Sequence, residues 1–326
     1  MNWKTLAAKV LAGGSVTRAE ALAVLASPPE ELLAVLDAAF AARRQYFGLG
    51  VSLHVIRNAK SGLCSEDCAY CSQAAKSTVP VSTYAMQSAD DILQGAREAQ
   101  ALKAMRYCIV TSGRAPLEQE LSTVCAAARR IKQAMPIQLC ASLGLVSADQ
   151  ARRLKRSGID RFNHNLETSE RYYPMICTTH HYRDRVGTVR AVKAAGLELC
   201  SGGLMGMGET PEDRVDLAFA LREVGADSIP INLLDPRPGT ALEGRGRLSA
   251  AEGLRILAMF RLVNPDRELR IAGGREVCLG PLQVLALYPA NSIFTNGYLT
   301  TPGQGHAADI AMIVAAGFHV TDTTHT

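Results

Sequence analysis

Short runs rich in β-branched and apolar residues alternate with longer amphipathic segments from about residue 50 onward, and Gly, Pro, Asn or Ser marks each boundary. This alternation predicts eight strands, at residues 51–57, 106–111, 137–142, 159–165, 197–201, 227–232, 268–272 and 291–295. It predicts a helix after each strand, at residues 89–104, 117–134, 147–157, 182–195, 211–225, 249–263, 281–287 and near 307–316. Eight strands that are each followed by a helix are typical of a (β/α)8 TIM-type barrel, an α/β fold. An open, doubly wound sheet is the alternative.

The first 47 residues have helical periodicity without intervening strands, most clearly at 17–26 and 30–47. Pro28 and Pro29 end one helix and begin the next. Because no long linker, repeat or low-complexity tract interrupts the remaining sequence, we predict a helical extension at 1–47 and a single barrel domain at 48–326.

The charge pattern argues against binding to a polyanion, because 35 basic and 31 acidic side chains leave a net charge of only +4 and form no continuous basic run. No stretch reaches the roughly 18 apolar residues of a membrane span, and Lys4 and Lys9 interrupt the first segment. We therefore expect a soluble, cytoplasmic protein that binds neither nucleic acid nor membranes. Nine cysteines in so large a chain indicate metal, redox or catalytic use in a reducing compartment rather than disulfides.

Three of these cysteines, Cys64, Cys68 and Cys71, follow the first predicted strand with the spacing Cys-x3-Cys-x2-Cys. Three thiolates on one loop can hold three corners of a cubic iron–sulfur cluster and leave the fourth iron open to another ligand, as a reaction centre requires. A loop after a barrel strand lies at the C-terminal mouth, where barrel enzymes keep their chemistry. The alternative is a zinc site whose fourth ligand is His54 or a distant cysteine.

Three other cysteines, Cys108, Cys140 and Cys200, lie inside predicted strands. Each taken singly is most simply a buried core thiol. Alternate strand residues point into a barrel, however, so the three can converge in its interior. Arg270 lies between apolar neighbours in another predicted strand and needs a polar partner there. Together they predict a second cluster, with Arg270 as a ligand or a counter-charge.

Polar residues gather at the end of the fourth predicted strand, where alternation puts Asn163, Asn165 and Glu167 on one face. Such a row of hydrogen-bond donors and acceptors suits a polar ligand, and a capped turn is the alternative. Arg185 falls on a predicted helix, and periodicity does not separate an exposed position from a functional one.

Cys177 lies in the predicted loop after the fourth strand, where it is either exposed or able to reach a cluster and permit an auxiliary centre larger than [2Fe-2S]. Cys125 and Cys278 are most simply structural.

The triplet, with Tyr70 directly before its last cysteine, resembles the signature of the radical S-adenosylmethionine (SAM) superfamily. The strand cysteines, Arg270 and the segments 161–169, 200–210, 228–232 and 270–276 resemble the biotin synthase family within it. The resemblance runs from about Leu53 to Phe318 and includes the C-terminal region associated with biotin and thiamin synthesis.

This resemblance implies an enzyme that inserts sulfur into dethiobiotin to form biotin. A [4Fe-4S] cluster on Cys64, Cys68 and Cys71 would split SAM into methionine and a 5′-deoxyadenosyl radical, and two SAM would be used per product. An auxiliary [2Fe-2S] cluster on Cys108, Cys140, Cys200 and Arg270 would donate the sulfur.

The same resemblance implies that four residues contact SAM, namely Tyr70, Asn165, Glu167 and Arg185. It implies that Asn163 and Asn232 contact the ureido group of the substrate. The family often has Asp where this chain has Glu167. It also implies a flavodoxin or ferredoxin electron donor and a homodimer. The alternatives are another radical SAM enzyme acting on a different small molecule, and a non-catalytic iron–sulfur electron carrier or metal-storage protein.

Overall fold

The computed structural model describes residues 1–62, 64–300 and 303–321. Its strands are β1 (Gly50–Lys60), β2 (Arg106–Thr111), β3 (Gln138–Ser142), β4 (Arg161–Asn163), β5 (Glu198–Cys200), β6 (Gly203–Met205), β7 (Ser228–Leu233), β8 (Glu268–Ile271), β9 (Ser292–Phe294) and β10 (His319–Val320).

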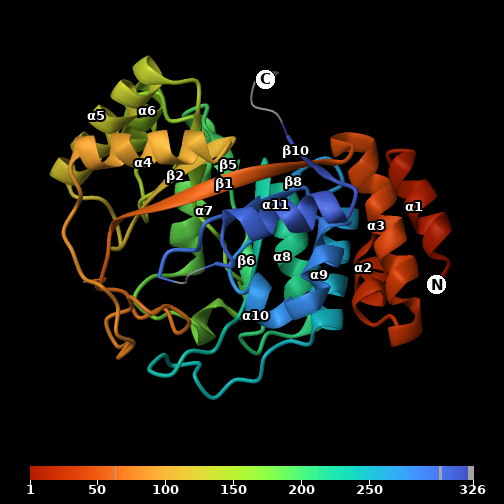
Figure 1. The fold of residues 1–326 in the computed structure, drawn as a ribbon. Coiled ribbons are helices and arrows are strands. Elements are labelled where there is room, and N and C mark those ends of the chain that lie inside the picture. Colours follow the sequence, from red (N-terminus) through yellow and green to blue (C-terminus); the bar gives the residue numbers. More distant parts are fainter. Residues whose placement is uncertain (63, 301–302, 322–326) are drawn as a thin grey trace.

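Eight of these strands close into a barrel. Neighbours pair in the order β1-β2-β3-β4-β5-β7-β8-β9, and β9 pairs back to β1. Every pairing is parallel, as a strand–helix repeat requires. The predicted TIM-type barrel is confirmed, and the open sheet is excluded because β1 and β9 are hydrogen-bonded. Figure 1 shows the strands in the centre and the helices around them.

The α-helices are α1 (Trp3–Leu11), α2 (Arg18–Leu25), α3 (Leu32–Phe47), α4 (Ala89–Ala101), α5 (Glu118–Ala134), α6 (Ala148–Arg156), α7 (Tyr182–Ala194), α8 (Pro211–Glu223), α9 (Ala250–Val263), α10 (Arg275–Leu279) and α11 (His306–Ala315). Short 3-10 helices lie at η1 (Pro29–Glu31), η2 (Tyr173–Met175) and η3 (Gly280–Leu287). Four outer helices begin with a capping box, in which a hydroxyl side chain and the side chain three positions later bond each other's backbone amides. The capping residues are Ser88, Ser147, Thr210 and Ser249.

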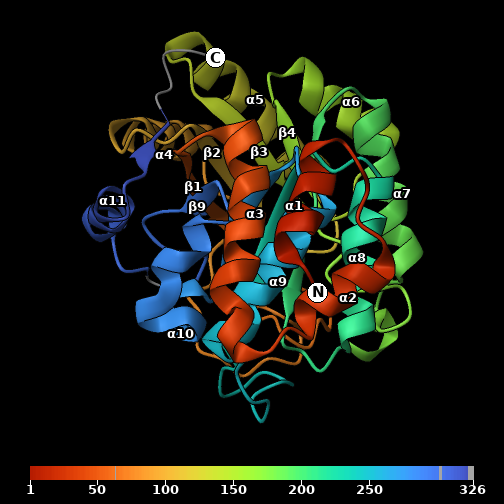
Figure 2. The ribbon, with the colours of Figure 1, turned by 90° about the vertical axis from the view of Figure 1, so that its right-hand side faces the viewer.

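The N-terminal helices form a layer on one side of the barrel. Helix α3 packs against α1 and α9, and α2 packs against α8 and α9, so the extension covers helices that themselves cover the barrel (Figure 2). Helix α1 was not predicted individually; its Asn2 cap and the buried side chains of Trp3, Leu6 and Val10 explain why it forms. No helix of the described residues is long and apolar enough to cross a membrane.

Several boundaries differ from the prediction. The fourth strand is shorter than expected, because the chain leaves the sheet after Asn163 and Glu167 takes a positive φ of 70°. The fifth predicted strand continues, after Ser201 and Gly202, as the separate strand β6. A Cβ atom on Gly202 would lie only 1.9 Å from the carbonyl oxygen of Pro230, so glycine is required at this close approach.

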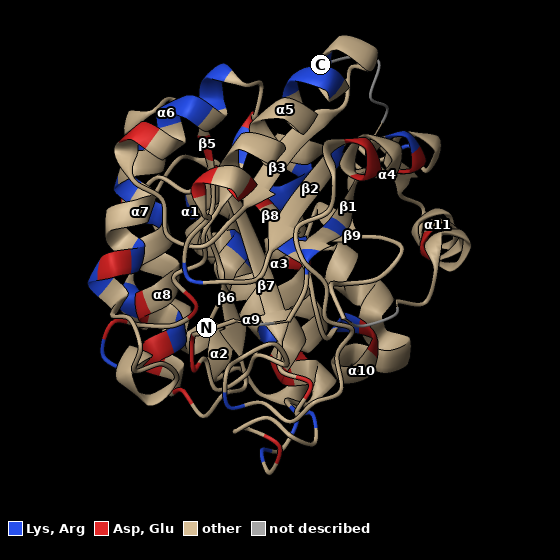
Figure 3. Cartoon of the chain, turned by 90° about the vertical axis from the view of Figure 1, so that its left-hand side faces the viewer, with Lys and Arg blue, Asp and Glu red and all other residues tan. Residues whose placement is uncertain are grey.

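The predicted helix at 281–287 is the 3-10 helix η3, and α10 precedes it. Pro281 lacks a backbone N–H to continue a regular helix from α10. The outer helices carry acidic and basic side chains interspersed (Figure 3), whereas the layer between barrel and helices is apolar.

Candidate active site

One cavity of about 360 Å³ runs into the barrel from its C-terminal mouth. All thirteen residues assigned to a site from the sequence line it. They are Cys64, Cys68, Tyr70, Cys71, Cys108, Cys140, Asn163, Asn165, Glu167, Arg185, Cys200, Asn232 and Arg270. Their roles stay predictions, but their convergence is a property of the fold.

The loop that carries the cysteine triplet is compact. The amide of Cys71 donates to the carbonyl of Cys68 at 3.0 Å, and the Cys71 sulfur accepts from the amide of Gln73 at 3.4 Å. Burial raises the pKa of the Cys71 thiol to about 11 in the cluster-free chain. Ligation at this position therefore has to displace a thiol proton.

A carboxylate fastens this loop to the segment between η2 and α7. Asp67 accepts hydrogen bonds from the amides of Thr178 at 2.9 Å and Thr179 at 3.2 Å. Burial alone would raise the pKa of Asp67, but these bonds and the Thr178 hydroxyl lower it further than burial raises it. The triplet loop is therefore held by a permanently charged anchor.

A fourth cysteine stands beside the triplet. The sulfur of Cys177 lies 3.9 Å from that of Cys68, and Cys177 is buried. The hydrogen bond from Cys68 lowers the pKa of Cys177 to about 4. The alternative that Cys177 is exposed is therefore wrong, and its suggested part in the auxiliary centre stays a prediction.

His54, considered as a zinc ligand for the triplet, lies elsewhere. It is in the lower half of β1, whereas the triplet follows the end of that strand, and its Nε2 is 3.2 Å from Glu268 and 3.3 Å from Arg270. Burial, followed by the charge of Arg270, lowers the pKa of His54 to about 3, so the imidazole is neutral. The zinc alternative with this ligand is excluded.

The strand cysteines meet deeper in the barrel. Cys108 and Cys140 are opposite each other in the β2–β3 register, and Nη1 of Arg270 lies 3.7 Å from the sulfur of Cys200. A hydrogen bond from Cys140 lowers the pKa of Cys108. Within the described chain, Nε of Arg270 is buried and unpartnered. Three soft thiol donors and an unused guanidinium donor fit an iron–sulfur cluster.

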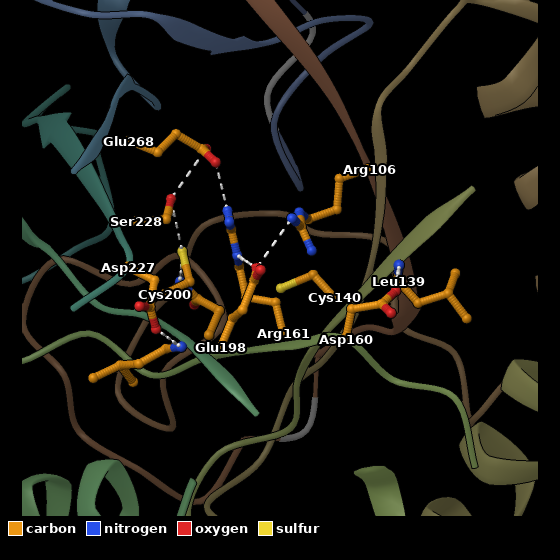
Figure 4. A network of polar contacts seen from close by, with 12 residues as sticks. Arg106, Leu139, Cys140, Asp160, Arg161, Glu198, Cys200, Asp227, Ser228 and Glu268 are labelled. Atoms are coloured by element: carbon orange, nitrogen blue, oxygen red, sulfur yellow. Dashed lines mark hydrogen bonds and ion pairs between the residues drawn. The ribbon is translucent and has the colours of Figure 1, made fainter. Parts of the chain in front are cut away.

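An ionic network that was not predicted from the sequence lies on the N-terminal side of these cysteines, at the first residues of β2, β4, β5 and β8 (Figure 4). Glu268 on β8 is 2.7 Å from Arg161 and also contacts Arg270, while Glu198 is 2.8 Å from Arg161 and 3.2 Å from Arg106. Strand alternation was a usable signal, since Glu268 and Arg270 are two residues apart and so share the inward face.

This network keeps Arg270 positively charged. Burial alone would lower the pKa of Arg270, but Glu268, Cys200 and Cys108 raise it above its usual value. A permanent positive charge therefore faces the strand cysteines, where it can balance thiolates or an anionic cluster.

The polar row at the end of β4 spans the space between the two cysteine sets. Nδ2 of Asn163 donates to Cys200 Sγ at 3.2 Å and to Asn165 Oδ1 at 3.3 Å, and Asn165 Nδ2 is 3.5 Å from Glu167. The row predicted from alternation is present, although only its first member belongs to the strand. Burial raises the pKa of Glu167.

Arg185 is buried at the mouth, so its reading as an exposed helix residue is wrong. Its Nη1 donates to the carbonyl of Asn165 at 2.9 Å and lies 3.6 Å from Glu167, and its Nε donates to Tyr173. The Tyr70 hydroxyl acts on Glu167 in the opposite sense to burial and lowers the pKa of that carboxyl. The amide of Asn232 is oriented by Gly203 and Gly273, at 3.2 and 2.9 Å.

Two family models match the chain. Residues 60–221 match the Radical SAM superfamily, and residues 230–319 match the Biotin and Thiamin Synthesis associated domain. The first match covers both cysteine triplets, and the second covers Asn232 and Arg270.

Curated relatives extend this similarity to nearly the full chain. Biotin synthase of Salinibacter ruber is 52% identical over 316 residues, which are 97% of this chain and 88% of the relative. Biotin synthase of Geobacillus kaustophilus is 51% identical over 319 residues, 98% and 96% of the two chains.

Solved structures share the architecture. Methylornithine synthase has a TM-score of 0.86 at 18% identity, with 98% of both chains covered. The FeFe-hydrogenase maturase HydG from Carboxydothermus hydrogenoformans has a TM-score of 0.82 at 16% identity, with 98% of this chain and 79% of that one covered. At these identities the likeness concerns the fold alone.

Proposed function

The chain belongs to the biotin synthase family, and from this premise we propose how its own residues serve the reaction. The enzyme is a radical SAM sulfur-inserting enzyme that converts dethiobiotin to biotin. The observation that carries the residue assignment is the presence of two separate thiol triplets along one cavity.

The two cysteine triplets are assigned to two different clusters. Cys64, Cys68 and Cys71 would hold a [4Fe-4S] cluster, and Cys108, Cys140 and Cys200, with Arg270, would hold an auxiliary [2Fe-2S] cluster. When bound, these groups supply electron transfer to SAM, hydrogen-atom abstraction by the resulting radical, and the inserted sulfur. The buried strand thiols, the half-buried triplet thiols at the mouth and the unpartnered Nε of Arg270 support this division.

Residues at the mouth orient SAM. Arg185 is held through its Nε and Nη1 atoms, and its fork-shaped guanidinium can pair with the methionine carboxylate. Asn165 and Glu167 present acceptors for the ribose hydroxyls, and Nδ2 of Asn165 lies 3.5 Å from the Glu167 carboxylate. Glu167 is one methylene longer than Asp, and its positive φ turns the backbone at this point.

Residues between the two triplets position dethiobiotin. Asn163 and Asn232 each carry an amide donor and an acceptor, the complement of a ureido N–H and carbonyl. Asn163 also donates to the sulfur of Cys200, so the residue that would meet the substrate touches a ligand of the sulfur-donating cluster. This short connection supports delivery of sulfur to a carbon held beside that ligand.

The chain-level assignments follow from the same family. Residues 1–47 form a helical extension, and residues 48–326 form the radical SAM barrel with its biotin- and thiamin-synthesis-associated region. The enzyme works in the cytoplasm as a homodimer and takes electrons from a flavodoxin or ferredoxin.

The test separates the two triplets by substitution. Anaerobically reconstituted Cys200→Ala is expected to cleave SAM to 5′-deoxyadenosine but to form no biotin, whereas Cys64→Ala is expected to do neither. Cys125→Ala, on a helix outside the cavity, is the matched control. Mass spectrometry of both products gives the readout, and biotin formation by Cys200→Ala at the wild-type level would refute the division.

A further inference from the structure

A second set of metal-binding atoms lies beside the cysteine triplet and contains only one of its members. The sulfurs of Cys68 and Cys177 and a ring nitrogen of His180 all lie within 4.8 Å of one another. Cys177 and His180 are 4% and 5% exposed, so both donors are directed into the protein. We refer to these three residues as the thiol–imidazole cluster.

The distances within this cluster match those of a tetrahedral metal site. Two thiolates on such an ion are about 3.8 Å apart, and a thiolate and an imidazole nitrogen are about 3.5 Å apart. The Cys68 and Cys177 sulfurs are 3.9 Å apart, and Cys177 Sγ lies 3.3 Å from His180 Nδ1.

Two contacts orient the imidazole of His180. Nδ1 of His180 lies 2.5 Å from Oε2 of Glu66, a hydrogen-bond distance, so this contact has to open when Nδ1 binds an ion. On the other side of the ring, Nε2 of His180 is 2.8 Å from the hydroxyl of Tyr173. Metal-binding histidines commonly use their second nitrogen in this way, which fixes the ring and directs the first nitrogen at the ion.

We propose that Cys68, Cys177 and His180 bind a single divalent transition-metal ion when the cluster is absent, and that a solvent molecule completes the coordination. Two sulfurs and a nitrogen favour Zn²⁺ or Fe²⁺ and disfavour Mg²⁺ and Ca²⁺, which prefer all-oxygen sites. The Cys68 thiol loses its proton on binding, and no electron transfer is involved.

Because Cys68 belongs both to this site and to the cysteine triplet, ion binding here affects assembly of the cluster. If Cys68 is also a ligand of the [4Fe-4S] cluster, which rests on the proposed function, one sulfur cannot serve both centres in the same geometry. A Zn²⁺ ion held here then blocks cluster assembly until it is removed, and binding of the single ion itself does not depend on that assignment.

The direct test uses Co²⁺ as a spectroscopic probe in cluster-free, full-length protein under anaerobic conditions. In a Cys64→Ala/Cys71→Ala background, which removes the rest of the triplet, Co²⁺ is expected to give tetrahedral d–d bands and sulfur-to-cobalt charge-transfer absorption. Adding Cys177→Ala is expected to abolish one equivalent of this signal, and adding Cys278→Ala is expected to change nothing. All variants share the strand cysteines, so any Co²⁺ signal from these cysteines cancels when the spectra of two variants are subtracted.

The outcomes separate the site from its consequence. Identical Co²⁺ titrations with and without Cys177→Ala, in variants with equal circular dichroism, would overturn the metal site. A second experiment with Zn²⁺ then tests the effect on cluster assembly. Zn²⁺ added before reconstitution is expected to slow [4Fe-4S] formation in the wild type and to slow it less in Cys177→Ala. Equal slowing in both, with the cobalt result intact, would overturn the shared role of Cys68 and leave the ion site standing.

Discussion

The carboxylate of Glu268 is the best point at which to test whether the ionic network below the strand cysteines stabilises the barrel. Its side chain is 14% exposed, and its partners Arg161 and Arg270 are 6% and 2% exposed. Glu268→Gln keeps the shape and an acceptor oxygen but removes the negative charge. Both guanidinium groups then lose a counter-charge in a site with little water.

Removing one partner of a buried ion pair costs about 3–5 kcal/mol. At about 2.1 cal/mol/K per residue, a chain of 326 residues has an unfolding entropy near 0.7 kcal/mol/K. Glu268→Gln should therefore lower the Tm of the cluster-free protein by about 4–7 °C. Differential scanning calorimetry at neutral pH measures this shift.

Glu198→Gln is the matched control, because Glu198 contacts the same Arg161 but is 49% exposed. An exposed pair is worth about 0–1 kcal/mol, so this variant should melt within about 1–2 °C of the wild type. If Glu268→Gln also melts within that interval, burial does not make the network stabilising and the reasoning is wrong.

The pH dependence gives the same prediction a second test. Burial alone would raise the pKa of Glu268, but Arg161, Arg270 and His54 lower it well below its usual 4.5. A carboxylate with a lowered folded-state pKa contributes stability above its unfolded pKa and loses it as the pH falls below that value. The Tm difference between wild type and Glu268→Gln should be constant near neutrality and shrink below about pH 4.5. A difference that grows on acidification would contradict this sign.

Three further substitutions test other parts of the site. Arg185→Lys should weaken SAM binding about 10- to 100-fold in equilibrium dialysis. A charge-assisted hydrogen bond is worth about 1.5–3 kcal/mol, and lysine lacks the two-pronged guanidinium that binds a carboxylate. Unchanged affinity would remove Arg185 from the SAM site. Gly202→Ala should destabilise the cluster-free protein by about 3 kcal/mol or more in urea unfolding, whereas Gly244→Ala, where a Cβ meets nothing within 4 Å, should not; equal midpoints would disprove the steric argument. Asn163→Leu removes the N–H donated to Cys200 and should make the reduction potential of the auxiliary cluster more negative in an EPR-monitored titration, and a more positive potential would contradict this.

The barrel and the convergence of the two triplets were predictable because both follow from short-range regularities. Strand–helix alternation determines the architecture, and the inward alternation of strand residues brings Cys108, Cys140 and Cys200 to one interior. The row of polar side chains at Asn163 and Asn165 was predictable for the same reason, even though β4 ends at Asn163.

The rest depends on contacts between distant segments. The burial of Arg185 is decided by Tyr173 and Glu167, which reach it from other parts of the chain. The position of Cys177 depends on the irregular segment that Asp67 anchors, for which no periodicity exists. Glu268 was within reach of alternation, but its partners on β4 are known only once the strands are paired.

The network of Glu268, Arg161 and Glu198 lies toward the N-terminal ends of the barrel strands, on the side of the strand cysteines away from the mouth. On the proposed function, SAM and dethiobiotin bind between the mouth and these cysteines. A sulfur source that enters by the mouth then reaches the strand cysteines only while both are absent, so renewal of the auxiliary cluster and turnover alternate.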